Sequence, residues 1–316
     1  MRNLPSSKTI IQLIHDTPVV QLKHLSEAVG ASIFAKLEFF NPGGTIKDRV
    51  ALAMIEAAED AGVLRGKTTL VEATSGSMGV AMALVGSAKG FQVTLVVREG
   101  VGRDKIKLMK LLGAKVVLTA ASDGIQGSIN SANQIVSSDP KAVYLNQFDN
   151  DANWIVHRDF TACELHNQIG GLDVLCVGAG SGGTLRGLVE FYRKSKTRSP
   201  KFVLVEPVGS LFSSSTFEGS SAIEGIGTSI RSTIANEAFV SEAVDHCVQV
   251  KDEDAFQALR RVAKSDGLLG GSSTGAVVHA AMHVGRQMPG ARIAILATDA
   301  YTQHASTLPA RLLEAE

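Results

Sequence analysis

Short apolar runs alternate with longer amphipathic stretches along the chain, and this alternation restricts the fold more than any other feature. The strand candidates are rich in β-branched residues and read SIFAKLE, TTLVEA, FQVTLVV, AKVVLTA, LDVLCVGA, KFVLVEP and RIAILAT. Between them lie stretches with helical periodicity, such as IKDRVALAMIEAAEDAG, RDKIKLMKLLGA, DEDAFQALRRVAKSDG and TGAVVHAAMHVGRQM. This order predicts an α/β protein with mostly parallel strands.

Composition and charge argue against several classes of function. With 316 residues, of which 45% are hydrophobic and 20% charged, the chain can bury a large core as one large domain or two interlocked ones. Lys+Arg and Asp+Glu both number 31, so there is no net charge to attract nucleic acid or a membrane surface. The 3 cysteines are widely spaced, without a CxxC pattern, which argues against a disulfide framework or a metal site. Neither a signal peptide nor a membrane span is indicated, and we expect a cytoplasmic protein.

The stretch NPGGTIKDR, residues 41–49, joins a strand candidate to a helix candidate. Thr45 and Asp48 fit a helix-capping pattern, which predicts a helix from Ile46 with Lys47 in its first turn. The positive end of the helix dipole disfavours an ammonium there, so Lys47 would be available as a nucleophilic amine. An exposed surface lysine is the ordinary alternative.

A second strand-to-helix junction, GAGSGGT at residues 178–184, follows LDVLCV. Glycines allow backbone N–H groups to surround an anion, and a helix N-terminus adds a favourable dipole. No Gly-Lys-Ser/Thr follows, and the dinucleotide pattern G-x-G-x-x-G is matched only loosely. The junction predicts a phosphate site, with a tight turn as the alternative.

Two further junctions carry hydroxyl groups at helix starts. EATSGSMG presents Thr74, Ser75, Gly76 and Ser77, which suit a carboxylate, although a plain helix cap has the same composition. GGSSTGAVV adds a serine pair. Because ligands of open α/β sheets bind beyond the carboxyl ends of the strands, these junctions are expected to converge. A nucleophilic lysine, a phosphate site and a carboxylate site without metal ligands together fit pyridoxal 5′-phosphate (PLP), which carries an aldehyde and a phosphate.

The same segments resemble a known family. NPGGTIKDR, TSGSMG, NQFDNDANWIVH, GSGGT, EGIG and GGSSTGA occur in the order and approximate spacing of the cysteine synthase and cystathionine β-synthase family, the fold type II PLP enzymes. The resemblance extends from about residue 17 to about residue 300. It implies two three-layer α/β/α domains with mostly parallel twisted sheets, similar to the β subunit of tryptophan synthase.

The resemblance also implies roles for individual residues. Lys47 would be the Schiff-base lysine and the proton shuttle for Cα. Cofactor contacts besides Lys47 would come from Ser77, Gly180, Ser181, Gly182, Gly183, Thr184 and Ser272, the last at the pyridine nitrogen. Substrate contacts would come from Thr74, Ser75, Gly76, Met78, Gln147, Gly225 and Gly227. The large PLP-binding domain would comprise residues 1–48 and 152–316, and residues 49–151 would form a smaller mobile domain that binds substrate.

Three departures from the family pattern bear on the substrate. Ser77 and Met78 stand where common cysteine synthases have Asn and Thr, HRDFTACEL replaces a T-T-G-P-E-I-like run, and ATDAYTQHAS replaces P-D-S-G-E-R-Y-L-S. A shorter side chain at Ser77 and an apolar one at Met78 suggest a site retuned toward a bulkier or non-sulfide acceptor. Neutral drift is the alternative.

The resemblance implies a PLP-dependent β-replacement on an activated L-serine, O-acetylserine or O-phosphoserine, through an α-aminoacrylate, with cysteine synthase as the expected activity. Alternatives are β-replacement with an amine or amino-acid acceptor, as in a 2,3-diaminopropionate-type synthase of siderophore pathways or a cystathionine β-synthase, and a serine or threonine dehydratase. A non-catalytic homologue that binds PLP or a partner is a further alternative. The expected partners are a second copy of the chain, in a homodimer, and the C-terminal tail of a serine acetyltransferase.

Overall fold

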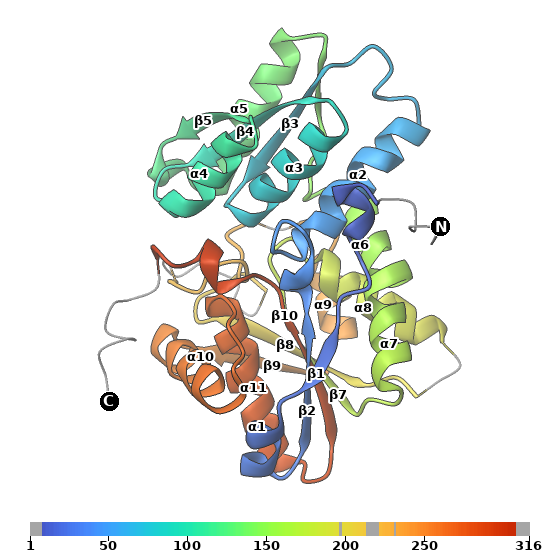
Figure 1. The fold of residues 1–316 in the computed structure, drawn as a ribbon, viewed down its shortest axis with the longest axis vertical. Coiled ribbons are helices and arrows are strands. Elements are labelled where there is room, and N and C mark those ends of the chain that lie inside the picture. Colours follow the sequence, from blue (N-terminus) through green and yellow to red (C-terminus); the bar gives the residue numbers. More distant parts are fainter. Residues whose placement is uncertain (1–7, 196–197, 213–220, 231, 308–316) are drawn as a thin grey trace, which may run out of the picture.

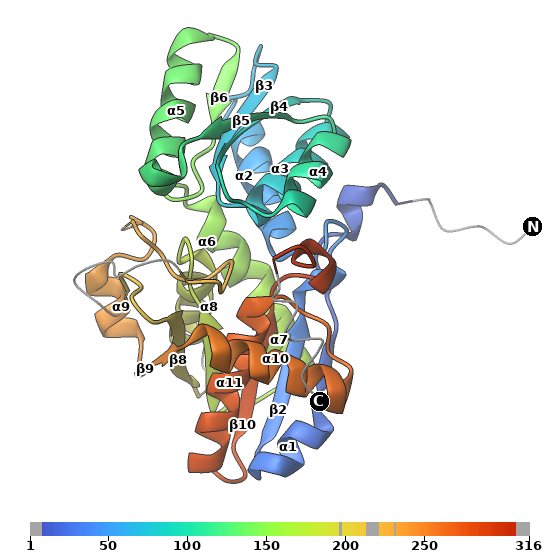
Figure 2. The same ribbon diagram turned by 90° about the vertical axis from the view of Figure 1, so that its left-hand side faces the viewer.

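The computed structural model describes residues 8–195, 198–212, 221–230 and 232–307, which form two β-sheets with helices on their faces (Figures 1 and 2). The six-stranded sheet has the order β1-β2-β10-β7-β8-β9, and the four-stranded sheet has the order β5-β4-β3-β6. β1 pairs antiparallel with β2, and the other strand pairings of the described residues are parallel. The predicted α/β fold with mostly parallel sheets is therefore confirmed.

The elements of each sheet occupy separate parts of the chain. The strands of the larger sheet are β1 (Val19–Gln21), β2 (Ser32–Leu37), β7 (Val174–Gly178), β8 (Lys201–Pro207), β9 (His246–Val250) and β10 (Arg292–Ala297). Those of the smaller sheet are β3 (Thr69–Thr74), β4 (Gln92–Arg98), β5 (Lys115–Thr119) and β6 (Ala142–Tyr144). The smaller sheet is thus inserted between β2 and β7 of the larger one.

Helices cover both faces of the six-stranded sheet. One face packs against α1 (Lys23–Val29), α10 (Asp252–Asp266) and α11 (Ser272–Gln287). The other packs against α7 (Cys163–Ile169), α8 (Gly183–Lys194) and α9 (Glu237–Ala243). β10 lies inside this sheet and is buried on both sides, which explains its uninterrupted apolar sequence.

The four-stranded sheet is also covered on both faces. α2 (Lys47–Asp60), α3 (Ser77–Ala88) and α4 (Arg103–Leu111) share one apolar cluster with β3 and β4. α5 (Gly124–Ser138) packs against the opposite face. The chain enters this half of the molecule through α2 and leaves it before α6 (Ala152–Val156), which continues as a π-helical turn over His157–Ala162. Both halves are therefore three-layer α/β/α units.

All seven strand candidates of the sequence correspond to strands, and β1, β6 and β9 were not predicted. These three lie at the edges of their sheets. An edge strand buries less side-chain surface than a central one, and β1, β6 and β9 have no long apolar run by which they can be recognised. β5 is also an edge strand, but its run KVVLT was recognised. Within the described residues, no helix is both long and apolar enough to cross a membrane.

Candidate active site

Lys47 is the first residue of α2, at the point where the chain leaves the larger sheet. Its backbone N–H donates to Thr45 Oγ1 (3.2 Å). The Thr45 half of the predicted capping pattern is therefore present, but the Asp48 half is wrong, because the Asp48 carboxylate accepts from the N–H of Gly43 and not from that of Thr45. The Thr45 hydroxyl donates instead to Asp299 Oδ1 (2.6 Å). The tight turn before α2 thus supplies the hydrogen-bond partner of Asp48. Lys47 still lies in the first turn of α2.

The Lys47 ammonium has no hydrogen-bond partner among the described residues. Burial lowers the pKa of Lys47, and the negative charge of Asp299 partly opposes this effect. A lowered pKa increases the share of neutral amine, which is the form that attacks an aldehyde. The geometry therefore provides a partly buried, unpaired amine, which agrees with the nucleophilic alternative and not with a surface lysine.

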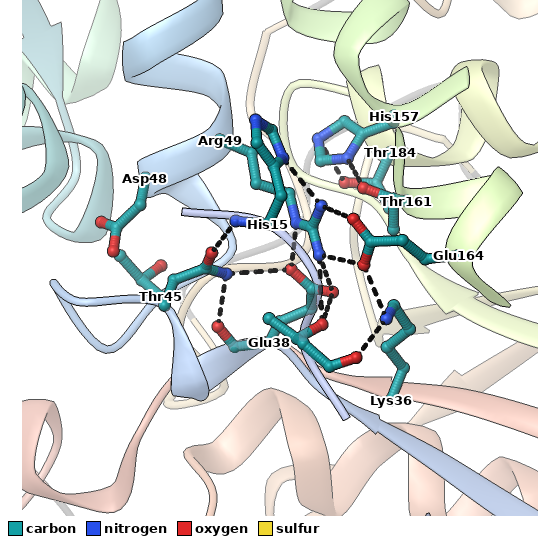
Figure 3. Close-up of polar contacts among 12 residues, drawn as sticks. His15, Lys36, Glu38, Thr45, Asp48, Arg49, His157, Thr161, Glu164 and Thr184 are labelled. Carbon is teal, nitrogen blue, oxygen red and sulfur yellow. Dashed lines mark hydrogen bonds and ion pairs between the residues drawn. The ribbon is translucent and has the colours of Figure 1, made fainter. Parts of the chain in front are cut away.

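A buried cluster of charges fixes α2 two residues after Lys47 (Figure 3). Arg49 Nε lies 2.7 Å from Glu38 Oε2, and its two terminal nitrogens lie 2.6 and 2.7 Å from the oxygens of Glu164. Lys36 Nζ lies 2.8 Å from Glu164 Oε2. Burial by itself would raise the pKa of Glu164, but the hydrogen bonds and charges of Arg49 and Lys36 lower it to about 2. Sequence reasoning missed this cluster, although the run SIFAKLE contains two of its charged residues, Lys36 and Glu38.

The loop between β7 and α8 is a close-packed backbone turn. Gly182 has a φ of 84°, and a Cβ on it would lie 2.2 Å from Ala235 Cβ. A Cβ on Gly183 would lie 2.2 Å from Asn153 Oδ1, a buried atom without a hydrogen-bond partner. The first amides of α8 have no partner within the helix and face outward at its positive end. Glycine is required at both positions, and the loop fits the phosphate of PLP.

Side chains beside this loop hold it in place. Asn153 Nδ2 donates to Ser181 Oγ (3.0 Å), and Thr184 Oγ1 lies 3.3 Å from His157 Nε2. Burial lowers the pKa of His157, and nearby cations lower it further, so the ring is neutral. Gly180 approaches the loop of residues 221–230 so closely that a Cβ would lie 2.9 Å from the carbonyl oxygen of Gly225. Neither Asn153 nor His157 was assigned a role from the sequence.

Thr74, Ser75 and Gly76 connect β3 to α3, at the carboxyl end of the smaller sheet. Thr74 Oγ1 accepts from the N–H groups of Gly76 (3.0 Å) and Gly79 (3.1 Å), and Ser75 is exposed. Gln147 Nε2 donates to the carbonyl oxygen of Ala73 (2.9 Å), which places Gln147 beside Thr74. The structure therefore brings together the residues to which a substrate carboxylate was assigned, and their role stays a prediction.

Ser77 and Met78 face different surroundings. Ser77 is the first residue of α3, and its hydroxyl donates to Asp299 Oδ2 (2.8 Å). Met78 is 2% exposed and belongs to the apolar cluster of the smaller sheet. Ser77 thus contacts the larger half of the molecule, whereas Met78 is a core side chain.

Ser272 is the first residue of α11, and its Oγ accepts from the N–H of Glu224 (2.9 Å). Gly225 and Gly227 both have positive φ values, 87° and 80°, and the N–H of Gly227 donates to the carbonyl oxygen of Ala179 (2.7 Å). The loop of residues 221–230 is thereby tied to the start of α11 and to the glycine loop before α8.

Asp299 connects these parts, although no role was assigned to it from the sequence. It lies just after β10, bonds Thr45 and Ser77, and would meet a Cβ on Gly225 at 3.6 Å. The strand-to-helix junctions around Lys47, α3, α8 and α11 therefore converge, as expected. In the part of the chain that the structure describes, no group of three or more His, Cys, Asp or Glu could hold a metal ion.

Comparison with known proteins identifies the family. Residues 10–299 match the profile described as pyridoxal-phosphate dependent enzyme. The chain is 36% identical over 299 residues to cysteine synthase B of Campylobacter jejuni, covering 94% of this chain and 97% of that protein.

Two solved structures have nearly the same fold. O-ureido-L-serine synthase superposes with a TM-score of 0.91 at 28% identity, over 98% of this chain and 96% of the other. The O-acetylserine dependent cystathionine beta-synthase of Helicobacter pylori superposes with a TM-score of 0.89 at 31% identity, over 96% and 98%. The matched profile shows that PLP is the cofactor, and the lysine amine and the glycine loop of the site fit it. The chain is therefore a member of the pyridoxal-phosphate dependent enzyme family, and within that family it is similar to cysteine synthases.

Proposed function

We propose that the chain catalyses β-replacement on an activated L-serine, either O-acetylserine or O-phosphoserine, with cysteine synthase activity. The observation that carries this proposal is the unpaired, partly buried amine of Lys47, which opens α2 where the helix starts of α3, α8 and α11 converge. Similarity to proteins named cysteine synthase over nearly the whole chain supports it.

Different residues of the site would bind the cofactor and transfer the protons. Bound PLP supplies an electron-withdrawing ring that stabilises negative charge at Cα of the amino acid. The amides at the start of α8 and the Thr184 hydroxyl would hold its phosphate, and Ser272 would meet its ring nitrogen. Lys47 would remove the Cα proton before the β-leaving group departs and return a proton after the acceptor adds. Its lowered pKa suits it to both steps.

The donor carboxylate would bind to Thr74, Ser75 and Gln147, next to α3. We propose that this contact draws the smaller half, residues 49–151, toward the larger half, residues 1–48 and 152–316. The two sheets are separate units joined through α2 and the segment before α6, which is an arrangement that permits such a motion.

The acceptor is tested by product analysis. The PLP-loaded protein is given O-acetylserine or O-phosphoserine, first with sulfide and then with a panel of amines, amino acids and homocysteine. We expect leaving-group release that depends on the acceptor, with cysteine formed fastest. Faster turnover of a larger acceptor would reassign the second substrate, and pyruvate release independent of any acceptor would indicate a dehydratase. If neither donor loses its leaving group, the proposed function is wrong.

We also propose a homodimer in the cytoplasm, with a serine acetyltransferase tail as an occupant of the site. The family resemblance supports both partners. Light scattering of the PLP-loaded protein gives the oligomeric state, and a peptide with the sequence of such a tail should compete with the donor. A monomer, or a peptide without effect on donor KM, would contradict the respective proposal.

A further inference from the structure

A row of polar side chains links the two halves of the molecule beside the candidate active site. Lys105 Nζ, on α4, lies 2.5 Å from Glu224 Oε2. His304 Nδ1 lies 3.3 Å from the same Glu224 oxygen, and His304 Nε2 lies 3.2 Å from Asp299 Oδ2. Asp299 Oδ2 in turn accepts from Ser77 Oγ, on α3. This row, called the bridge below, begins and ends in the smaller half and has the larger half's side chains in its middle.

His304 occupies the centre of the bridge and is enclosed there. Its side chain is 1% exposed, and those of Asp299 and Lys105 are 3% and 2% exposed. A Cβ on Gly271, just before α11, would lie 2.6 Å from His304 Nε2, so the ring packs directly against the backbone. A neutral imidazole donates from one nitrogen, whereas an imidazolium donates from both. Nδ1 has no hydrogen bond but lies within ion-pair distance of Glu224, so only the charged form can bond Asp299 and attract Glu224 at the same time.

The bridge lies against the loop to which the donor carboxylate is assigned. A Cβ on Gly76 would lie 2.8 Å from Lys105 Cδ, so the lysine stem covers this loop. Asp299 also bonds Thr45, two residues before Lys47, and its charge acts on the Lys47 amine. A change in the charge of His304 therefore affects both the loop of residues 74–76 and the start of α2, which carries Lys47.

We propose that His304 is a positioning residue for the reaction, whose imidazolium holds Asp299 and Glu224 together and so fixes Ser77 and Lys105 beside the donor-carboxylate loop. The proposal rests on the proposed function in that it needs an anionic amino-acid donor. His304 does not touch the reacting atoms, and it acts through Asp299 and Glu224.

The charges around His304 favour its protonated form, the imidazolium. Burial alone would lower the pKa of His304, but the carboxylates of Asp299 and Glu224 raise it above the ordinary value, against the opposing charge of Lys105. Asp104, on α4, accepts from the N–H of Ser306, which lies two residues after His304. Because the folded pKa is raised, the bridge is complete at low pH and is lost as the pH rises through that value.

Loss of the proton has a specific kinetic consequence. A neutral His304 removes a positive charge from between the carboxylates of Asp299 and Glu224. This lies next to a loop that must accept a third carboxylate from the donor substrate. Donor binding weakens, so the donor KM should rise with pH by about tenfold. The value of kcat should change much less, because Lys47 still performs the proton transfers.

The test compares the PLP-loaded wild type with His304→Gln, whose amide can donate at any pH, and with His246→Gln, a control at an exposed position of β9. Donor KM and kcat for O-acetylserine are measured from about pH 6 to about pH 9, the range in which histidine titrates. We expect a donor KM that rises with pH in the wild type and in the control, and a flat profile in His304→Gln. A rise in His304→Gln equal to that of the wild type would overturn the proposal.

A second measurement needs no turnover. Amide hydrogen exchange of residues 299–307 in the PLP-loaded protein, corrected for intrinsic rates, should show protection that falls with pH in the wild type and not in His304→Gln. If His304→Gln does not fold, Lys105→Met removes the other end of the bridge, and its exchange in residues 299–307 should be faster at low pH. Unchanged protection in the variant would contradict the proposal. Failure of both donors with intact exchange behaviour would instead reject the proposed function.

Discussion

The pKa and the position of Lys47 depend on neighbours that cannot be recognised in the sequence. Its pKa is lowered by burial, and its position is fixed by the Arg49 cluster on one side and by Asp299 on the other. The motif NPGGTIKDR indicated a helix start and a nucleophile. The helix start is confirmed, and the nucleophile stays a prediction. The partners of Arg49 and Thr45 lie as far as 115 and 254 residues away in sequence, so no local pattern could have predicted them.

Arg49→Met tests how strongly the charge cluster stabilises the fold. It leaves Glu38 buried without its paired cation and Glu164 with Lys36 alone, and we expect the free energy of unfolding of the apo protein to fall by about 3–5 kcal/mol. Arg261→Met, at an exposed position of α10, is the control and should change stability by less than about 0.5 kcal/mol. Urea denaturation measures both variants. Equal small effects would show that the cluster contributes no more than a surface charge.

The glycine loop before α8 depends both on local signals in its sequence and on contacts with distant segments. The sequence predicted the loop and its anion-binding character because glycines and a helix start are local signals. It could not predict that Ala235 and Asn153 pack against Gly182 and Gly183, because these contacts join distant segments. The central strands and the edge strand β5 were predicted, whereas the edge strands β1, β6 and β9 have no continuous apolar run and were not.

Gly182→Ala separates backbone strain from crowding at this loop. Gly182 and Gly90 have φ values of 84° and 82°, but a Cβ on Gly90 would meet nothing within 4 Å. Gly90→Ala should therefore lower the free energy of unfolding by about 1–2 kcal/mol through strain alone, with unchanged PLP affinity. Gly182→Ala should cost more and should also weaken PLP binding.

Adding Ala235→Gly to Gly182→Ala removes the crowding and leaves the strain. The double variant should recover stability toward that of Gly90→Ala, and PLP affinity should recover with it because the loop backbone can return to its position. Spectroscopic titration with PLP and denaturation of the apo protein give the two quantities. Full PLP affinity in Gly182→Ala itself, despite its lost stability, would show that the loop does not form the phosphate site.

The whole molecule consists of two α/β/α units whose junction contains the candidate active site (Figure 2). The alternation of strands and helices was enough to predict this class of fold, and the convergence of the junctions follows from parallel strands. The contacts across the junction were not predictable, because Ser77, Asp299 and His304 come from separate segments and meet only in the folded chain. Ser77 and His304 lie in two of the segments in which the sequence departs from the family pattern.

We expect Lys47 to be the residue that binds PLP, and trapping the cofactor on its lysine amine shows whether it is. The PLP-loaded protein is reduced with borohydride, digested, and mapped by mass spectrometry, with Lys47→Ala treated in parallel. We predict one pyridoxyl group on the peptide containing Lys47, and no fixed label and no visible cofactor absorbance in Lys47→Ala. A label on another lysine of the wild type, such as Lys105, or an equally labelled Lys47→Ala would contradict the account.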